Sequence, residues 1–266
     1  MEWTAFETAA AEAATAAGQL IRPWAGRAPG VAAKGHPADL VTECDRRSEA
    51  LIADLLRPRF PDHGFVGEEG GGRAEAEYVW HVDPIDGTTN FVHGLPGFCV
   101  SIGLCRAGRP IAGAVYDPVA GELFSASAGA GARVNGQLLR VAGQAAVAEA
   151  LIGTGIPPVE PPRDWALRSL VAVAGRARNV RNLGSAALQL CYVAAGRLSG
   201  FWEPSLRSWD VAASVVILRE AGGRATALDG EEWHAGLRGC AGTNGAIHDE
   251  LLGILAGVPG PQASAD

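Results

Sequence analysis

The sequence predicts a chain of the α+β class, with helices and strands in both halves. Three observations predict it: a helical repeat of apolar residues within the first 24 residues, a run of strand-like segments from 99 to 126, and alternation of strands and helices after about 148. At 266 residues the chain is long enough for two domains. The change of pattern across 138–148 predicts one domain at residues 1–142 and a second at residues 143–266.

Composition and charge argue against several classes of function. Hydrophobic residues make up 48% of the chain and charged residues 19%, which is typical of a globular protein. The net charge is −7 and no run of Lys or Arg occurs, so we expect no nucleic-acid substrate. The five cysteines form no C-x-x-C pair, which argues against zinc and favours buried free thiols in a reducing compartment.

The N-terminal segment predicts a packing helix rather than a targeting sequence. Apolar residues at helical spacing predict a long amphipathic helix that ends within 23–30; they are Trp3, Phe6, Ala10, Ala13, Ala17, Leu20, Ile21 and Trp24. Glu2, Glu7 and Glu12 argue against a basic signal-peptide region, and no apolar stretch is long enough to span a bilayer. We therefore expect a cytoplasmic protein with no membrane partner.

A turn and a second helix come next along the chain. Gly35 and Pro37 favour a turn or hairpin, and Thr42 is a suitable N-cap for a helix that runs to about Arg57. Asp45 then lies in the first turn of that helix, where the helix dipole favours a negative charge. On this segment alone, Asp45 is interpreted as a capping residue and Lys34 as a solvated surface charge.

A short strand at 64–67 leads into two adjacent acids, Glu68 and Glu69. Adjacent residues of a strand point to opposite faces, so at most one of these acids would face a given site directly, while the other would face away or reach round to it. We expect 70–77, which begins with three glycines, to be a surface loop. The alternative for the two acids is an exposed acidic turn without a functional role.

Two carboxylates after the buried strand 78–82 are the strongest functional signal. Pro84 prevents a simple helix, so Asp83 and Asp86 are expected on a bent, rigid turn. Two carboxylates about 4 Å apart repel by roughly 4 kcal/mol at an effective dielectric near 20. Carboxylate and carbonyl oxygens suit Mg²⁺ or Mn²⁺, which would relieve that repulsion. The alternative is an ordinary turn, because Asp, Pro, Gly and Asn are all turn residues.

Two further segments are candidate anion sites. Gly87-Thr88-Thr89 would offer backbone N–H groups if a helix begins there. Gly184 and Ser185 open an alanine-rich helix and form a second candidate, for which a small-residue N-cap is the alternative. Arg181 lies just before this second segment and could reach a phosphate, although an ordinary surface arginine would give the same pattern.

The remaining elements are a meander followed by alternating strands and helices. Strands at 99–105, 110–116 and 122–126 predict an antiparallel meander, and Asn135-Gly136 predicts a hairpin turn. In the second half we expect strands at 179–183, 198–202 and 239–243, and helices at 164–174, 184–195, 209–220 and 246–256. The chain contains no G-x-G-x-x-G, P-loop or G-x-S-x-G motif.

Four segments together resemble the inositol monophosphatase family, part of the lithium-sensitive, magnesium-dependent phosphatase superfamily that includes fructose-1,6-bisphosphatases. They are Asp39-Leu40-Val41-Thr42 with Asp45, Gly67-Glu68-Glu69, Asp83-Pro84-Ile85-Asp86-Gly87-Thr88-Thr89-Asn90-Phe91, and Trp209-Asp210-Val211-Ala212-Ala213. The match runs from about Lys34 to Leu252, and the two central motifs are specific in their order and spacing. The resemblance implies a layered α-β-α-β-α sandwich of the sugar-phosphatase type.

The resemblance also implies a site for two or three Mg²⁺ ions, with Mn²⁺ as a substitute. The first ion would be bound by Glu68, Asp83, the backbone carbonyl of Ile85 and, through water, Glu69. The second would be bound by Asp83, Asp86 and Asp210, and a third, weaker ion by Glu68 and waters. This places the metal ligands in the first domain, except for Asp210 in the second.

Catalytic and substrate roles follow from the same resemblance. Thr88 and Asp45 would polarise the attacking water, with Glu69 assisting through its own water, and Lys34 would support the metal shell. Backbone N–H groups of Gly87 and Thr88 would bind the phosphate. The positions matching substrate contacts are Gly184, Ser185, Ala186 and Glu203, with Arg181 near that pocket.

The implied function is Mg²⁺-dependent hydrolysis of a small phosphate monoester, first of all inositol monophosphate, by a homodimer. The alternatives among enzymes are histidinol-phosphate phosphatase, fructose-1,6-bisphosphatase and nucleotide 3′-phosphatase; Glu203 favours a polyol because a carboxylate accepts hydrogen bonds from ring hydroxyls. A different class of function is binding to the transcription machinery as an antitermination partner, as in some bacterial relatives. Ser214, where the family often has glycine, and the short loop 70–77 depart from the family pattern and leave the substrate open.

Overall fold

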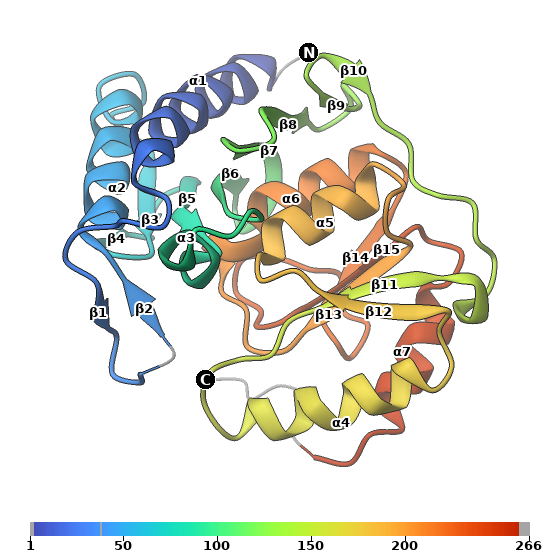
Figure 1. Ribbon diagram of the computed structural model, residues 1–266. Helices are drawn as coiled ribbons and strands as arrows, with labels where there is room; N and C mark the ends of the chain where they lie inside the picture. The colour runs from blue at the N-terminus through green and yellow to red at the C-terminus, as the bar shows by residue number, and fades with distance from the viewer. Residues whose placement is uncertain (1–2, 38, 261–266) are drawn as a thin grey trace.

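The computed structural model describes residues 3–37 and 39–260, which form alternating layers of helix and sheet (Figure 1). Helices α1 (Thr4–Ile21) and α2 (Glu43–Leu56) pack on an eight-stranded sheet, and α5 (Ala186–Ala194) and α6 (Ser208–Glu220) lie between it and a five-stranded sheet. On the far face of the second sheet lie α4 (Pro162–Ala174) and α7 (His248–Ala256). This order confirms the predicted α-β-α-β-α sandwich of the α+β class. The described residues leave out a few positions that the predictions include. They are 1–2 and 261–266, in the two predicted domains, and 38, in the predicted hairpin.

The eight-stranded sheet has the order β10-β9-β8-β7-β6-β5-β3-β4. Its strands are β3 (Gly64–Gly67), β4 (Gly71–Arg73), β5 (Tyr78–Asp86), β6 (Cys99–Arg106), β7 (Arg109–Asp117), β8 (Glu122–Ser127), β9 (Ala132–Val134) and β10 (Gln137–Leu138). Only β3 and β5 pair in parallel, and β6, β7 and β8 form the predicted meander. Asn135 and Gly136 have φ values of +47° and +82°, which confirms the predicted Asn-Gly hairpin.

The five-stranded sheet has the order β12-β11-β13-β15-β14. Its strands are β11 (Leu151–Thr154), β12 (Asn179–Asn182), β13 (Gly200–Glu203), β14 (Arg224–Thr226) and β15 (Cys240–Thr243). β11 pairs in parallel with β12 and β13, whereas β15 pairs antiparallel with β13 and β14. β11 and β14 are not among the predicted strands.

Short elements connect these layers. β1 (Ala32–Ala33) and β2 (Leu40–Val41) form the predicted hairpin, with Ala33 opposite Leu40. The first helix ends in a 3₁₀ turn, η1 (Arg22–Trp24), and a second 3₁₀ turn, η2 (Val147–Glu149), precedes β11. The prediction of a surface loop at 70–77 is wrong in part, because strand β4 lies within that range. Gly71 and Gly72 have φ values of +59° and +150°, and this left-handed backbone lets the chain turn back onto β3.

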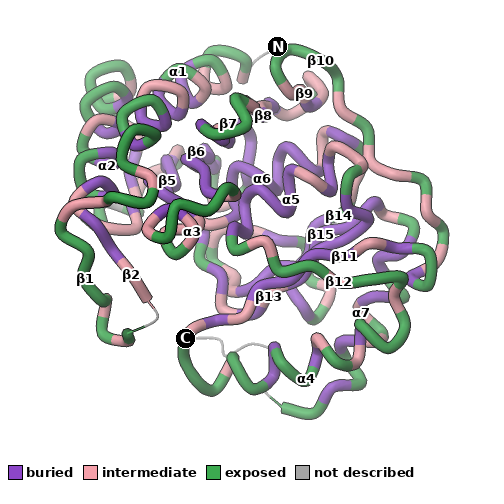
Figure 2. Tube along the Cα trace, viewed as in Figure 1, coloured by how far each residue is buried: buried purple, intermediate pink, exposed green. Residues whose placement is uncertain are grey.

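The helix α6 is buried between the two sheets (Figure 2). All residues from 211 to 218 are buried, so α6 is enclosed on every side. It lies close to the larger sheet because Gly103 on β6 and Gly113 on β7 have no side chains; a Cβ atom at Gly103 would lie 2.6 Å from the backbone nitrogen of Ala213. This close packing positions the first turn of α6, which carries Asp210, beside β5 and β6.

Two further expectations concern the state of the cysteines and the presence of a membrane-spanning helix. All five cysteines are free and buried, as predicted. In the described part of the chain, every helix is too short or too polar to cross a membrane.

Candidate active site

The end of β5 carries Asp83 and Asp86 on a β-bulge. Three steps along β5 from Asp83 to Asp86 match two steps along β6. Pro84 has no N–H to offer to a neighbouring strand, and the N–H of Ile85 donates to Asp83 Oδ1 at 3.0 Å. The expected rigid turn is therefore an irregular strand end, and both acids on it are buried.

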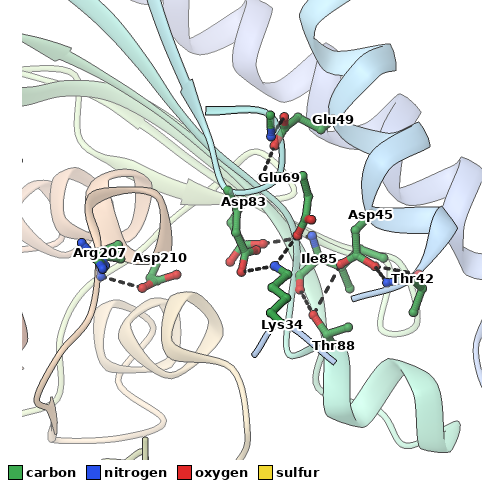
Figure 3. A network of polar contacts seen from close by, with 12 residues as sticks. Lys34, Thr42, Asp45, Glu49, Glu69, Asp83, Ile85, Thr88, Arg207 and Asp210 are labelled. Atoms are coloured by element: carbon green, nitrogen blue, oxygen red, sulfur yellow. Dashed lines mark hydrogen bonds and ion pairs between the residues drawn. The ribbon is translucent and has the colours of Figure 1, made fainter. Parts of the chain in front are cut away.

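The turn after β3 brings Glu68 and Glu69 together. The N–H of Glu68 donates to the Val82 carbonyl at 3.1 Å, which holds this turn against β5. Lys34 Nζ donates to Glu68 Oε1 at 2.9 Å and also to Glu69 Oε1 (Figure 3). The expectation that the two acids face opposite sides is wrong, because β3 ends at Gly67 and a turn does not alternate as a strand does. Lys34 is likewise not a solvated charge, since it bridges both carboxylates.

Asp45 caps α2 and also contacts Thr88, the first residue of α3 (Thr88–His93). Its Oδ2 accepts the N–H and the hydroxyl of Thr42 at 2.8 and 2.6 Å, so the capping interpretation is confirmed. The Thr88 hydroxyl lies 3.4 Å from Asp45 Oδ1 and 3.0 Å from the Ile85 carbonyl (Figure 3). Burial raises the pKa of Asp45 to about 6, although the hydrogen bonds from Thr42 act in the opposite direction.

Asp210 lies in the first turn of α6, and its Oδ2 accepts the N–H of Arg207 at 2.6 Å (Figure 3). The helix thus uses this acid as a cap, as the alternative interpretation of the sequence allows. Ser214, the departure from the family pattern, is buried, and its hydroxyl donates to the Val211 carbonyl at 3.1 Å. The extra hydroxyl is therefore satisfied within the helix and does not disturb Asp210.

The N-terminus of α5 binds the carboxylate of Asp86. Ser185 Oγ donates to Asp86 Oδ2 at 2.5 Å, and the N–H groups of Ala186 and Ala187 donate to the same carboxylate at 3.3 and 2.7 Å. Burial raises the pKa of Asp86 to about 6, and these hydrogen bonds act against the shift. The candidate anion site at Gly184–Ala186 therefore binds an anion of the protein itself, and its contact with substrate stays a prediction.

Four acids from three segments lie close enough for their charges to interact. Burial raises the pKa of Asp83 well above its usual range, and the charges of Glu68, Asp86 and Asp210 raise it further. Burial also raises the pKa of Asp210, with Glu68 and Asp86 adding to the effect. Burial raises the pKa of Glu68 too, although the Lys34 charge opposes the shift. The charged forms of these acids are therefore costly, and a cation bound among them would stabilise those forms.

The acids are not arranged as a ready-made cage. Within residues 3–37 and 39–260, no three His, Cys, Asp or Glu side chains lie together as ligands of one cation. Each acid has a partner in the protein: Glu68 accepts from Lys34, Asp83 from the N–H of Ile85, Asp86 from α5, and Asp210 from the N–H of Arg207. An all-oxygen donor set fits Mg²⁺ or Mn²⁺.

The predicted substrate residues divide into two groups. Glu203 ends β13, and burial raises its pKa well above the usual range, with the charges of Asp210 and Asp86 adding to the shift. Its carboxylate lies against Gly155, where a Cβ atom would overlap it. Arg181 is exposed on β12, and its Nη1 donates to Asn179 Oδ1 at 2.7 Å and to the Val180 carbonyl at 2.9 Å. The Glu203 carboxylate thus lies near enough to Asp210 and Asp86 to be affected by their charges, whereas the Arg181 guanidinium contacts its own strand.

A groove of about 530 Å³ lies elsewhere, between α1 and β8. Its two acids already have partners: Glu7 accepts hydrogen bonds from Ser125 and Ser127, and Glu12 pairs with Arg59. The groove therefore lacks the mutually repelling carboxylates found at the end of β5, so the latter are the better candidate for a catalytic centre.

Two residues that contact the site, Ser48 and Glu49, are not among the predicted site residues. Ser48 Oγ donates to the Pro84 carbonyl at 3.1 Å, and the Glu49 carboxylate accepts the N–H groups of Glu69 and Gly70. They lie three and four positions after Asp45, on the same face of α2, so helical spacing was the signal that could have found them.

Comparison with known proteins agrees with these observations. The sequence model of the Inositol monophosphatase family matches residues 2–258. The chain is 40% identical over 253 residues to an inositol-1-monophosphatase from Synechocystis, covering 94% of this chain and 88% of the relative. It is also 44% identical over 222 residues to the Nus factor SuhB from Pseudomonas aeruginosa, covering 80% of this chain and 82% of the relative.

The fold has a solved counterpart of nearly the same extent. An inositol monophosphatase structure from Anabaena matches with a TM-score of 0.85 at 36% sequence identity. The alignment covers 97% of this chain and 98% of the Anabaena chain.

Proposed function

Because the chain belongs to the inositol monophosphatase family, a family of phosphoric monoester hydrolases, we propose that it hydrolyses a small phosphate monoester with the help of divalent cations. Inositol monophosphate is the first substrate to test, since the Synechocystis and Anabaena relatives are named for it. The proposal for this chain rests on one observation above the others. Glu68, the pair Asp83 and Asp86, and Asp210 come from three separate segments, and the charges of Glu68 and Asp86 raise the pKa values of both Asp83 and Asp210.

The donor set supports Mg²⁺ as the cofactor, with Mn²⁺ as a substitute. Glu68, Asp83, Asp86, Asp210 and the carbonyl oxygen of Ile85 would be its ligands, and Glu69 would contribute through a water molecule. The ammonium of Lys34 lies between the carboxylates of Glu68 and Glu69, so a positive charge is already stabilised at this point. Bound ions would neutralise phosphate charge and lower the pKa of a bound water.

The protein's own groups would orient the attacking water. The Thr88 hydroxyl lies between Asp45 Oδ1 and the Ile85 carbonyl, so it can accept a proton from water while donating its own to Asp45. Backbone N–H groups of Gly87 and Thr88 would bind the phosphate oxygens. Such a site works by positioning and charge neutralisation, which agrees with the absence of a nucleophile motif in the sequence.

Glu203 supports a polyol as the alcohol part of the substrate. Its carboxylate lies near those of Asp210 and Asp86 and can accept hydrogen bonds from ring hydroxyls, and the turn at Gly184–Ala186 lies beside Asp86 where it could contribute further contacts. Arg181 would have to leave its contacts with Asn179 and Val180 before it could reach a substrate.

Phosphate release from a substrate panel tests the proposal. The panel contains inositol 1-phosphate, histidinol phosphate, fructose 1,6-bisphosphate and adenosine 3′-phosphate, each with and without Mg²⁺, and with lithium as an inhibitor. We expect Mg²⁺-dependent release that is highest for inositol 1-phosphate. Absence of Mg²⁺-dependent release from every substrate would refute the proposal.

Removal of one ligand charge tests the site itself. Asp210→Asn should lower phosphate release on the order of 100-fold or more, because changes even to the partners of metal ligands cost about 10–100-fold. Asp229→Asn, which changes an exposed acid, is the matched control and should leave the rate unchanged. Near-normal turnover by Asp210→Asn at ordinary Mg²⁺ concentration would contradict the assignment.

A second candidate function is binding to the transcription machinery. The 44% identity to the Nus factor SuhB of Pseudomonas aeruginosa favours it. Direct contact with nucleic acid is not favoured by a net charge of −7, so the partner would be a protein. Purified RNA polymerase should retain both the wild-type chain and Asp210→Asn if this role exists, since binding would not need the metal site.

A further inference from the structure

One face of α2 contacts three separate segments of the proposed metal site. Asp45, Ser48 and Glu49 are buried and follow the spacing i, i+3, i+4, which places them on one side of the helix. Asp45 contacts Thr88, Ser48 donates to the carbonyl of the bulge residue Pro84, and Glu49 contacts the turn after β3. A rigid helix thus contacts the turn after β3, the end of β5 and the first residue of α3, which supply the water-orienting hydroxyl and every proposed ligand except Asp210.

Glu49 makes the most specific of these contacts (Figure 3). Its Oε2 accepts the N–H of Glu69 at 2.8 Å, and its Oε1 accepts the N–H of Gly70 at 2.7 Å. The side chain is only 7% exposed, so both bonds to the charged group form away from bulk water, where such bonds are strong.

Two glycines make room for this carboxylate. A Cβ atom at Gly70 would lie 2.6 Å from Glu49 Oε1, and a Cβ atom at Gly67 would overlap the carboxylate as well. The turn therefore lies directly on Glu49, with one N–H aimed at each oxygen. The carboxylate fixes the backbone of Glu69, while the Glu69 side chain points to Lys34.

We propose that Glu49 is a positioning residue for divalent-cation binding. It holds the backbone of the turn so that Glu68 and Glu69 face Lys34 and Asp83, and it ties this turn to the helix that carries Asp45. The inference rests on the proposed metal-dependent function and extends it to a residue that binds neither metal nor substrate. A residue that served the fold alone would lower the melting temperature without changing metal affinity.

Glu49→Gln tests the proposal, because an amide accepts only one of the two N–H groups and turns its NH₂ toward the other. We expect Mn²⁺ and Mg²⁺ to bind about 10–100-fold more weakly to the metal-free protein in calorimetry, the usual cost of losing a ligand-orienting partner. Half-maximal phosphate release should need correspondingly more Mg²⁺, while kcat at saturating Mg²⁺ changes less. Amide hydrogen exchange in the peptide covering 64–73 should become faster.

Two further variants complete the design. Asp54→Asn removes an exposed acid from the same helix and should leave metal affinity and exchange unchanged. Gly70→Ala pushes the carboxylate aside without altering Glu49, and it should weaken metal binding in the same direction. If Glu49→Gln does not fold, Gly70→Ala carries the test with the same calorimetric and exchange measurements.

The outcomes separate this inference from the proposed function. Wild-type metal affinity and unchanged exchange in both Glu49→Gln and Gly70→Ala, alongside Mg²⁺-dependent hydrolysis by the wild type, would overturn only the role of Glu49. A lower melting temperature with unchanged metal affinity would also overturn it. Failure of the wild-type chain to bind Mn²⁺ or release phosphate would overturn the proposed function and this inference with it.

Discussion

Replacing Gly103 by alanine tests how the packing of α6 positions Asp210. The new Cβ atom would lie 2.6 Å from the backbone nitrogen of Ala213 and 2.8 Å from the carbonyl carbon of Ala212. Ordinary contact begins near 3.4 Å, so helix and strand must separate by about 3.4 − 2.6 = 0.8 Å. The new Cβ atom and the atoms of Ala212 and Ala213 that it overlaps are all fixed by the backbone, so no side-chain rotation can relieve the overlap.

This displacement has two measurable consequences. Overpacking of a close-packed core costs about 1–3 kcal/mol, which lowers the melting temperature of a chain of this size by about 2–12 °C. A misplacement of about 1 Å at a catalytic group can cost on the order of 100-fold in rate. We therefore expect Gly103→Ala to lose about 10–100-fold in phosphate release, measured at a temperature where circular dichroism shows the variant fully folded.

Gly143→Ala is the matched control for this experiment. Within the described part of the chain, no heavy atom lies within 4 Å of the position that a Cβ atom would take at Gly143, so this variant should melt and turn over like the wild type. Wild-type melting and turnover by Gly103→Ala would refute the reasoning, since they would mean that α6 can move without displacing Asp210.

Two further predictions concern charge in the site. The pKa values of Asp45 and Asp86 are raised to about 6 in the folded chain, so the metal-free protein should lose stability as pH rises from about 4 through 6. Asp45→Asn should remove part of this loss, which urea unfolding measured across the same pH range would show. Gly155→Ala should displace the Glu203 carboxylate and weaken kcat/KM for inositol 1-phosphate by about 10–100-fold, the worth of one hydrogen bond to a charged group. The same variant should hydrolyse p-nitrophenyl phosphate, which lacks ring hydroxyls, as well as the wild type does; equal losses on both substrates would contradict the role of Glu203.

Local signals in the sequence predicted much of the element order. The capping of α2 by Thr42, the hairpin at Asn135-Gly136 and the alanine-rich face of α1 all depend on residues within a few positions of one another. The irregular end of β5 follows from Pro84 in the same way. Such features can be predicted because the interacting groups are neighbours in the chain.

Contacts over long sequence separations account for the errors and omissions. Lys34 bridges Glu68 and Glu69 only because a hairpin lies against the turn after β3, and a strand pattern wrongly assigned those acids to opposite faces. The carboxylate of Asp86 lies at the N-terminus of α5, about a hundred residues further along the chain. The proposed boundary between residues 142 and 143 stays a prediction, as does the homodimer; α6 belongs to the second half yet packs on the sheet of the first.

The sequence alone determined which acids this protein carries, the α+β class, and the family pattern that groups those acids together. Only the tertiary structure decided that Asp210 lies beside β5, because its position depends on two strand glycines, Gly103 and Gly113, that admit the backbone of α6. The physical reason is one of range: caps, turns and periodicity act over a few residues, whereas the convergence of distant carboxylates depends on close packing between a helix and a sheet.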